Sequence, residues 1–79
     1  MPADQPLMQI KKNYNLLSEH QKTIANFIIS NIDHIANYSI GMLAQSCQVS
    51  NTTVIRFLNK LGYQSYPDFK IDLVRELSA

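Results

Sequence analysis

The sequence predicts an all-α domain of five helices that contains a helix-turn-helix: a homeodomain-like core of three helices with an extra N-terminal and C-terminal helix. Two observations lead to this fold class. Apolar residues recur at three- and four-residue spacing along most of the chain, and no stretch alternates apolar and polar residues as a half-buried strand does. The 79 residues allow one domain at most, and a chain of this length buries roughly 60% of its unfolded surface. We therefore expect one compact core for residues 1–79.

The first predicted helix covers residues 6–16, with Pro6 at its start, where a missing N–H costs nothing. Its apolar stripe consists of Leu7, Ile10, Tyr14 and Leu17. The apolar residues of this helix either pack on the domain's own core or form a dimer surface; they are Leu7, Met8, Ile10 and Tyr14. Lys11 and Lys12 lie off the stripe, where they either belong to a solvated face or contact a phosphate backbone.

A capping box begins the second predicted helix, which covers residues 19–31. The Ser18 hydroxyl oxygen accepts from the Gln21 amide, while the Gln21 side chain reaches back to the Ser18 N–H. The residues expected to face the core are Ile24, Phe27 and Ile28, with Ile29 as a further candidate. The stretch 33–38 that follows is too short for a full helix, and we expect a single turn in it.

The chain is organised around residues 39–62, in which two short helices, 40–47 and 51–61, meet at a tight corner. Apolar residues fall on one face of each helix, because residues three and four apart lie one above the other. The two apolar faces consist of Leu43, Ala44, Cys47, Val54, Phe57, Leu58 and Leu61. Two short helices joined in this way predict a helix-turn-helix.

The ends of these two helices carry their own signals. Ser39 and Ser50 each precede a helix and offer a side-chain acceptor to the free N–H groups of its first turn. Gln48 occupies the turn between the helices, where a positive φ would cost about 1 kcal/mol. Gly62 follows the second helix and adopts a positive φ without strain, so it ends the pair.

The last predicted helix covers residues 66–77. Pro67 stands in its first turn, and Asp68 there interacts favourably with the helix dipole. Further along, apolar residues continue at helical spacing. The residues that we expect in the core are Phe69, Leu73, Val74 and Leu77.

The face of the 51–61 helix opposite its apolar residues is polar and contains no acid. A merely solvated helix usually mixes Glu with Lys, so an acid-free face of Thr, Asn and Arg suits a partner rich in acceptors and phosphates. The formal net charge of +1 alone gives no support for such a partner. However, no acid occurs between Asp33 and Asp68, whereas Arg56 and Lys60 fall inside that interval. The alternative is an ordinary solvated face.

Four segments of the chain together match a known pattern. They are Leu17-Ser18-x-x-Gln21-Lys22-x-Ile24-Ala25, Ser39-Ile40-x-x-Leu43-Ala44, Val49-Ser50-x-x-Thr53-Val54-x-Arg56-Phe57-x-x-Lys60-Leu61-Gly62-Tyr63 and Tyr66-Pro67-Asp68-Phe69-Lys70. These segments resemble the N-terminal DNA-binding domain of the RpiR family of bacterial transcriptional regulators, and the resemblance covers nearly the whole chain. Two positions depart from the family pattern: Gln48 stands at a turn position that often holds a small residue, and Met42 at one that is often acidic.

The resemblance implies a parent protein with a further, C-terminal sugar isomerase domain, which binds a phosphorylated sugar and controls the affinity for DNA. That domain is absent from these residues, so the chain is expected to be an excised N-terminal part. It follows that a phosphosugar effector acts only through the missing domain. The implied function is transcriptional regulation of sugar or sugar-phosphate metabolism in the cytoplasm.

The polar face yields a hypothesis for double-stranded DNA. The 51–61 helix enters the major groove by its N-terminal half. The residues expected to read bases are Asn51, Thr52, Ile55, Arg56 and Asn59. The residues expected to bind phosphate are Ser39, Ser50, Thr53 and Lys60. Helix-turn-helix proteins commonly bind as dimers whose recognition helices lie about 34 Å apart, so we expect a homodimer and an inverted-repeat operator.

Other functions have weaker support. A helical protein-interaction module is the alternative, with Met42 and Ile55 as exposed anchors. An enzyme is disfavoured, because there is no carboxylate pair in an apolar pattern, no nucleophile beside a base and no glycine-rich loop. We therefore expect no catalytic residues and no cofactor.

The cysteine and histidine residues and the apolar segments of the chain indicate what to expect of metals, redox state and membranes. The single cysteine, Cys47, excludes an internal disulfide and lies on an apolar stripe, so we expect a structural thiol. His20 and His34 have no partner at metal-ligand spacing, and we expect no metal site. No segment approaches the roughly 20 apolar residues of a membrane span, and residues 1–7 lack the pattern of a signal peptide. The expectation is a soluble, cytoplasmic protein.

Overall fold

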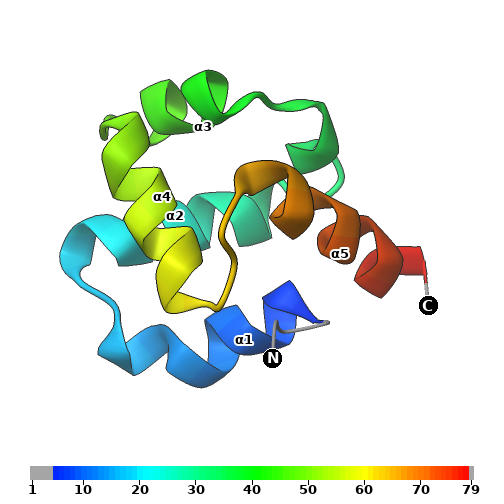
Figure 1. Ribbon diagram of the computed structural model, residues 1–79. Helices are drawn as coiled ribbons and strands as arrows, with labels where there is room; N and C mark the ends of the chain where they lie inside the picture. The colour runs from blue at the N-terminus through cyan, green and yellow to red at the C-terminus, as the bar shows by residue number, and fades with distance from the viewer. Residues whose placement is uncertain (1–4, 79) are drawn as a thin grey trace.

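The computed structural model describes residues 5–78, which form five α-helices and no strand, as the all-α prediction requires (Figure 1). The helices are α1 (Pro6–Asn13), α2 (Glu19–Ser30), α3 (Ile40–Cys47), α4 (Asn51–Lys60) and α5 (Tyr66–Ser78). Two 3-10 turns, Tyr14–Leu16 and Ile35–Asn37, follow α1 and precede α3. Helix α4 packs against α2, α3 and α5, while α1 packs against α5. Helix α4 thus contacts three of the other four helices.

Helix α1 ends earlier than the predicted 6–16 helix, because the chain tightens into a 3-10 turn over Tyr14–Leu16. The Asn13 side chain donates to the Gln9 carbonyl at 2.9 Å, and Asn13 itself leaves helical geometry with φ −102° and ψ 6°. Such side-chain bonds compete with the helical backbone pattern. Leu17 then becomes extended and buried. The other helices begin and end within one residue of the predicted bounds.

Serine side chains cap the starts of four helices. Ser18 accepts from the Gln21 amide at 3.2 Å while its own N–H donates to Gln21 Oε1 at 3.0 Å, so the predicted capping box is confirmed. Ser39 and Ser50 accept from the backbone N–H of the third residue of α3 and of α4, Met42 and Thr53, each at 3.1 Å. Ser65 does the same at the start of α5, at 3.3 Å from the Asp68 nitrogen. Each bond satisfies a donor that the helix itself leaves free.

The corner between α3 and α4 depends on a left-handed residue. Gln48 has φ 58° and ψ 42°, and its N–H donates to the Gln45 carbonyl while the Val49 N–H donates to the Ala44 carbonyl. These two bonds make a Schellman motif, which normally contains glycine at this position. Gly62, with φ 95°, ends α4 in the same way. The strained position that the sequence indicated at Gln48 is therefore present.

The core is formed by apolar faces of all five helices. Both predicted faces of the helix-turn-helix are buried, and the largest fully buried side chains include Phe57 and Phe69. Ile10 is also wholly buried, so the α1 stripe packs on the domain's own core, although Met8 is 56% exposed. The 3-10 turn in the predicted 33–38 segment buries Ile35 completely.

Three apolar residues proposed for the core are exposed instead. Val74 and Leu77 are 46% and 47% exposed, and Ile29 is 39% exposed. Val74 lies about 100° round the helix from the buried Leu73. In the last turn of α5, Glu76 and not Leu77 meets α1, since its Oε1 accepts from the Leu7 N–H at 2.8 Å. Helical spacing alone did not show which side of α5 the neighbouring helices cover.

We expect Gln48→Gly to stabilise the domain by about 0.5–1 kcal/mol, because glycine adopts positive φ without the clash of a Cβ atom. The measurement is the thermal midpoint, which should rise by about 2–8 °C in a domain of this size. Gln45→Gly is the matched control: Gln45 is exposed within α3, where glycine should destabilise by about 1 kcal/mol. A lower midpoint for Gln48→Gly would contradict the strain at this corner.

Candidate nucleic-acid interface

One face of α4 is buried, and the opposite face is therefore turned outward. Val54, Phe57 and Leu58 are completely buried against the rest of the core. Of the residues predicted to read bases, Asn51, Thr52, Arg56 and Asn59 are exposed, and Ile55 is half-buried against the edge of the core. The fold thus gathers the predicted base-reading residues on one accessible side of a single helix.

The start of α4 presents a pair of hydroxyl groups. The Ser50 and Thr53 hydroxyl oxygens lie 2.9 Å apart, and the Ser50 oxygen also accepts from the Thr53 N–H. One hydroxyl hydrogen is used between the two oxygens, which leaves the second available to an outside acceptor. The N–H groups of the first turn lie beside this pair, and they favour an anion such as a phosphate. Ser39 gives α3 a similar capped start.

The other end of α4 carries Lys60, whose ammonium group is already engaged. Its Nζ donates to the Leu16 carbonyl at 2.6 Å and lies 3.5 Å from Gln21 Oε1. Leu16 belongs to the 3-10 turn between α1 and α2, and Gln21 belongs to the first turn of α2. Lys60 was predicted to bind phosphate, and its three N–H donors allow a phosphate contact beside these bonds. Sequence spacing gave no sign of the contact with Leu16, which lies 44 residues away in the chain.

The interval from residue 34 to residue 67, which includes α3 and α4, contains no acidic side chain. Among residues 5–78, the one ion pair joins Asp72 and Arg75 on α5, at 3.8 Å. Arg56 and Lys60 therefore have no carboxylate partner within the described structure. Unpaired cations on an acid-free surface give a positive local field, which attracts the phosphate backbone of nucleic acids.

Two titratable side chains in the core have structural roles. Burial raises the pKa of the Cys47 thiol, which keeps it protonated and unreactive on the inner face of α3. Burial also raises the pKa of Tyr66 to about 12, and its hydroxyl donates to the Tyr38 carbonyl at 3.0 Å.

No three His, Cys, Asp or Glu side chains of residues 5–78 lie together as metal ligands do. None of the described helices is long and apolar enough to cross a membrane.

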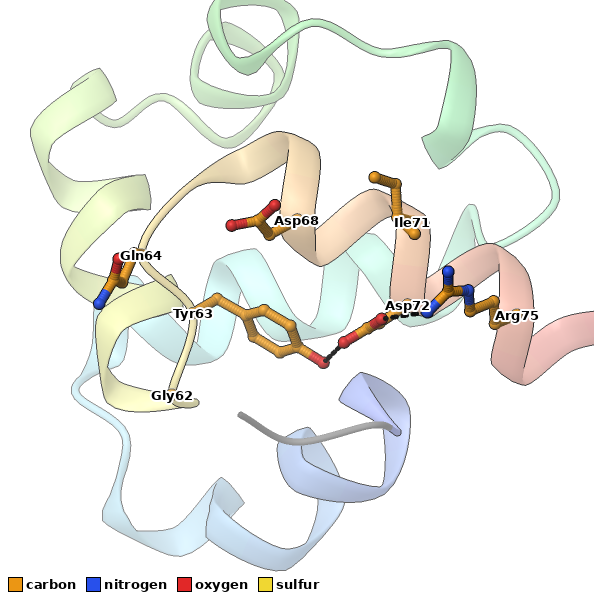
Figure 2. A pocket seen from close by; sticks show the side chains of 7 residues that line it. All are labelled: Gly62, Tyr63, Gln64, Asp68, Ile71, Asp72 and Arg75. Atoms are coloured by element: carbon orange, nitrogen blue, oxygen red, sulfur yellow. Dashed lines mark hydrogen bonds and ion pairs between the residues drawn. The ribbon is translucent and has the colours of Figure 1, made fainter. Parts of the chain in front are cut away.

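A separate hollow of about 600 Å³ lies between the α4–α5 loop and α5 (Figure 2). Its lining consists of Gly62, Tyr63, Gln64, Asp68, Ile71, Asp72 and Arg75. In Figure 2 the Tyr63 hydroxyl points to Asp72, to which it donates at 2.9 Å, and Arg75 approaches the same carboxylate from the other side. Two carboxylates against one guanidinium make this hollow unsuited to a nucleic acid. Sequence reasoning missed the hollow, since no spacing pattern links its loop and helix residues.

A capped helix pair joined by a tight corner, with an exposed and acid-free second helix, defines a helix-turn-helix DNA-binding domain. Residues 5–79 match the helix-turn-helix domain of the rpiR family, and the chain belongs to this family. It is therefore a DNA-binding domain of transcriptional regulators and not an enzyme. The suspected family resemblance is confirmed.

Three relatives show how far the similarity extends. The chain is 36% identical over 61 residues to an uncharacterised HTH-type transcriptional regulator of Clostridium perfringens. This match covers 77% of this chain and 22% of the relative. It is 34% identical to the regulator HexR of Pseudomonas aeruginosa and 31% identical to HexR of Escherichia coli. These matches cover 92% and 91% of this chain, and 26% and 25% of the relatives.

The chain thus spans about a quarter of the length of the curated relatives it matches. No solved structure matches the sequence. The similarity concerns the DNA-binding domain alone, and it extends over all five helices of the described structure.

The start of α4 yields a stability prediction. We expect Ser50→Ala to destabilise the domain by about 1 kcal/mol, because the Thr53 N–H loses its acceptor and the hydroxyl pair is broken. The thermal midpoint should fall by roughly 4–8 °C. Ser46→Ala is the control, since Ser46 is exposed within α3 and caps no helix. Equal midpoints for the two variants would show that the Ser50 cap contributes nothing.

Proposed function

We propose that this chain binds double-stranded DNA in a sequence-specific manner, as the N-terminal domain of a bacterial regulator of sugar or sugar-phosphate metabolism. The observation that carries the proposal is the outer face of α4. Arg56 is exposed there without a carboxylate partner, between the Ser50 cap at one end of the helix and Lys60 at the other. Membership of the rpiR family supports the same function.

Base reading is assigned to the exposed side of α4. Its N-terminal half enters the major groove, where the Arg56 guanidinium suits the O6 and N7 acceptors of guanine. Thr52 reaches a base edge with its hydroxyl or sets its methyl group against that of thymine. Asn51 and Asn59 offer amide groups to base edges, and the exposed part of Ile55 fits a thymine methyl.

Phosphate binding is assigned to both ends of the helix pair. Ser39 and Ser50 lie beside the free N–H groups of the α3 and α4 starts, so a phosphate there meets backbone donors and a hydroxyl together. Thr53 adds the second hydroxyl of the pair, and Lys60 adds a charge at the other end of α4. These contacts orient the helix on the duplex and carry no sequence information themselves.

A homodimer on an inverted-repeat operator completes the proposal. One module of this size buries little surface on DNA, and two recognition helices about 34 Å apart reach successive major grooves. The phosphosugar effector and the control of affinity are assigned to a C-terminal domain outside this chain, and the regulator is assigned to the cytoplasm, where its DNA lies.

The test is fluorescence anisotropy with duplex DNA, first of random sequence and then of sequences selected from a random library, at low and physiological salt. We expect Arg56→Ala to weaken binding to a selected duplex by about 5- to 150-fold, which corresponds to about 1–3 kcal/mol for a bidentate base contact. Arg75→Ala removes another exposed arginine, from α5, and is the matched control. It should leave the affinity unchanged.

Salt separates this function from the alternative of a helical protein-interaction module. Binding through phosphates weakens steeply as salt rises, whereas docking through Met42, which is 50% exposed, would respond little. Equal affinities of the Arg56→Ala and Arg75→Ala variants would overturn the assignment of the α4 face. A folded protein that binds no duplex at low salt would favour the interaction module.

A further inference from the structure

The C-terminal end of α4 is hydrogen-bonded to the α1–α2 junction, residues 14–18. Lys60 Nζ donates to the Leu16 carbonyl at 2.6 Å and lies 3.5 Å from Gln21 Oε1. The same Gln21 oxygen accepts from the Ser18 N–H at 3.0 Å, as part of the capping box. One lysine on α4 therefore joins the end of the 3-10 turn and the start of α2. The junction lies beside the last turn of α4, as Figure 1 also shows.

The α1–α2 junction is also flanked by other cations. Lys22, on the first turns of α2, lies with its Nζ 5.4 Å from the centre of the Tyr14 ring. Lys11 and Lys12 occupy the last turn of α1, immediately before the junction. Together with Arg56 and Lys60 on α4, these are five of the seven lysine and arginine residues of the chain, and Glu19 is the one acid on the same segments.

The remaining charges are distributed differently. Helix α5 carries three acids, Asp68, Asp72 and Glu76, beside Lys70 and Arg75. The ion pair of Asp72 with Arg75 lies there, and residues 14–18 of the α1–α2 junction form none with the described residues. At the junction, Lys60 is bonded to uncharged oxygens and Lys22 lies over a ring, so no carboxylate of residues 5–78 neutralises either cation. The domain thus has a basic side that extends past α4 to the junction.

The length of α4 relates this basic side to DNA. From Thr52 to Lys60 the helix rises about 12 Å, at about 1.5 Å per residue. The major groove is also about 12 Å wide. When the N-terminal half of α4 lies in the groove, its last turn and the α1–α2 junction reach the edge, where the phosphate backbone runs.

We propose that the α1–α2 junction is a second phosphate-binding surface of this domain, in which Lys22 and Lys60 bind the DNA backbone beside the groove that α4 enters. Lys60 has two functions in this arrangement. One N–H holds the Leu16 carbonyl and so sets the position of the junction relative to α4, while another donates to a phosphate oxygen. The inference rests on the proposed DNA binding and extends it to a part of the fold outside the helix-turn-helix.

A purely structural role of Lys60 makes a different prediction. A lysine that only satisfies the carbonyl at the end of the 3-10 turn stabilises the fold but neutralises no phosphate. Its loss would lower the thermal midpoint and leave the salt dependence of DNA binding unchanged. The salt dependence is therefore the measurement that separates the two roles, because its slope counts the phosphates that the protein neutralises.

The experiment measures binding to a random-sequence duplex by fluorescence anisotropy over a series of salt concentrations, for the wild type and for Lys22→Gln, Lys60→Gln, Lys60→Arg and Arg75→Gln. We expect Lys22→Gln and Lys60→Gln each to reduce the slope of log K against log salt by about 0.9, the value for one phosphate. Lys60→Arg should keep the wild-type slope. Arg75→Gln removes one charge from α5 and should also keep it.

Each other outcome has a distinct meaning. Unchanged slopes for Lys22→Gln and Lys60→Gln, while Arg56→Ala still weakens binding, would overturn the junction surface and leave the proposed DNA binding intact. A changed slope for Lys22→Gln alone would overturn the role given to Lys60. A wild-type protein whose binding does not respond to salt would overturn both proposals. Lys22→Gln keeps the test decisive if Lys60→Gln fails to fold, because the Lys22 side chain lies over the Tyr14 ring and makes no hydrogen bond with residues 5–78.

Discussion

Burial of the apolar face of α4 is the interaction on which the rest of this structure depends. Val54, Phe57 and Leu58 are wholly excluded from water, and they contact a core to which every other helix contributes. Removing a side chain of this kind from water stabilises a protein by roughly 1.5–3 kcal/mol. Because one side of α4 is buried so completely, its opposite side has no freedom of orientation, and Thr52, Arg56 and Asn59 point to solvent together.

Local interactions at the ends of the helices fix where each helix begins and ends. Serine caps begin α2, α3, α4 and α5, and left-handed residues at Gln48 and Gly62 end the two helices of the helix-turn-helix. The left-handed residues turn the chain sharply, so that α3 and α4 form a corner and not a longer helix. Glutamine at one of these positions costs more than glycine would. The surrounding core holds the corner in place despite that cost.

Charge is segregated on the folded domain although the chain as a whole is nearly neutral. Asp72 of α5 contacts Tyr63 and Arg75 beside the hollow, while the cations of α4 and of the α1–α2 junction have no carboxylate partner among the described residues. The domain therefore has a basic side although its net charge is only +1. This arrangement suits a family of DNA-binding regulators. The long-range attraction between a protein and DNA depends on the local field at the protein surface more than on the net charge of the protein.

The sequence by itself determined the helix class, the serine caps, the left-handed corner and the acid-free face of α4, because each depends on residues within a few positions of one another. The buried side of α5, the early end of α1 and the bond between Lys60 and Leu16 depended on the tertiary structure. Periodicity places Phe69, Leu73, Val74 and Leu77 on one helix but does not say which neighbours cover it. The Lys60 bond joins residues 44 positions apart, and only the packing of α2 against α4 brings them together.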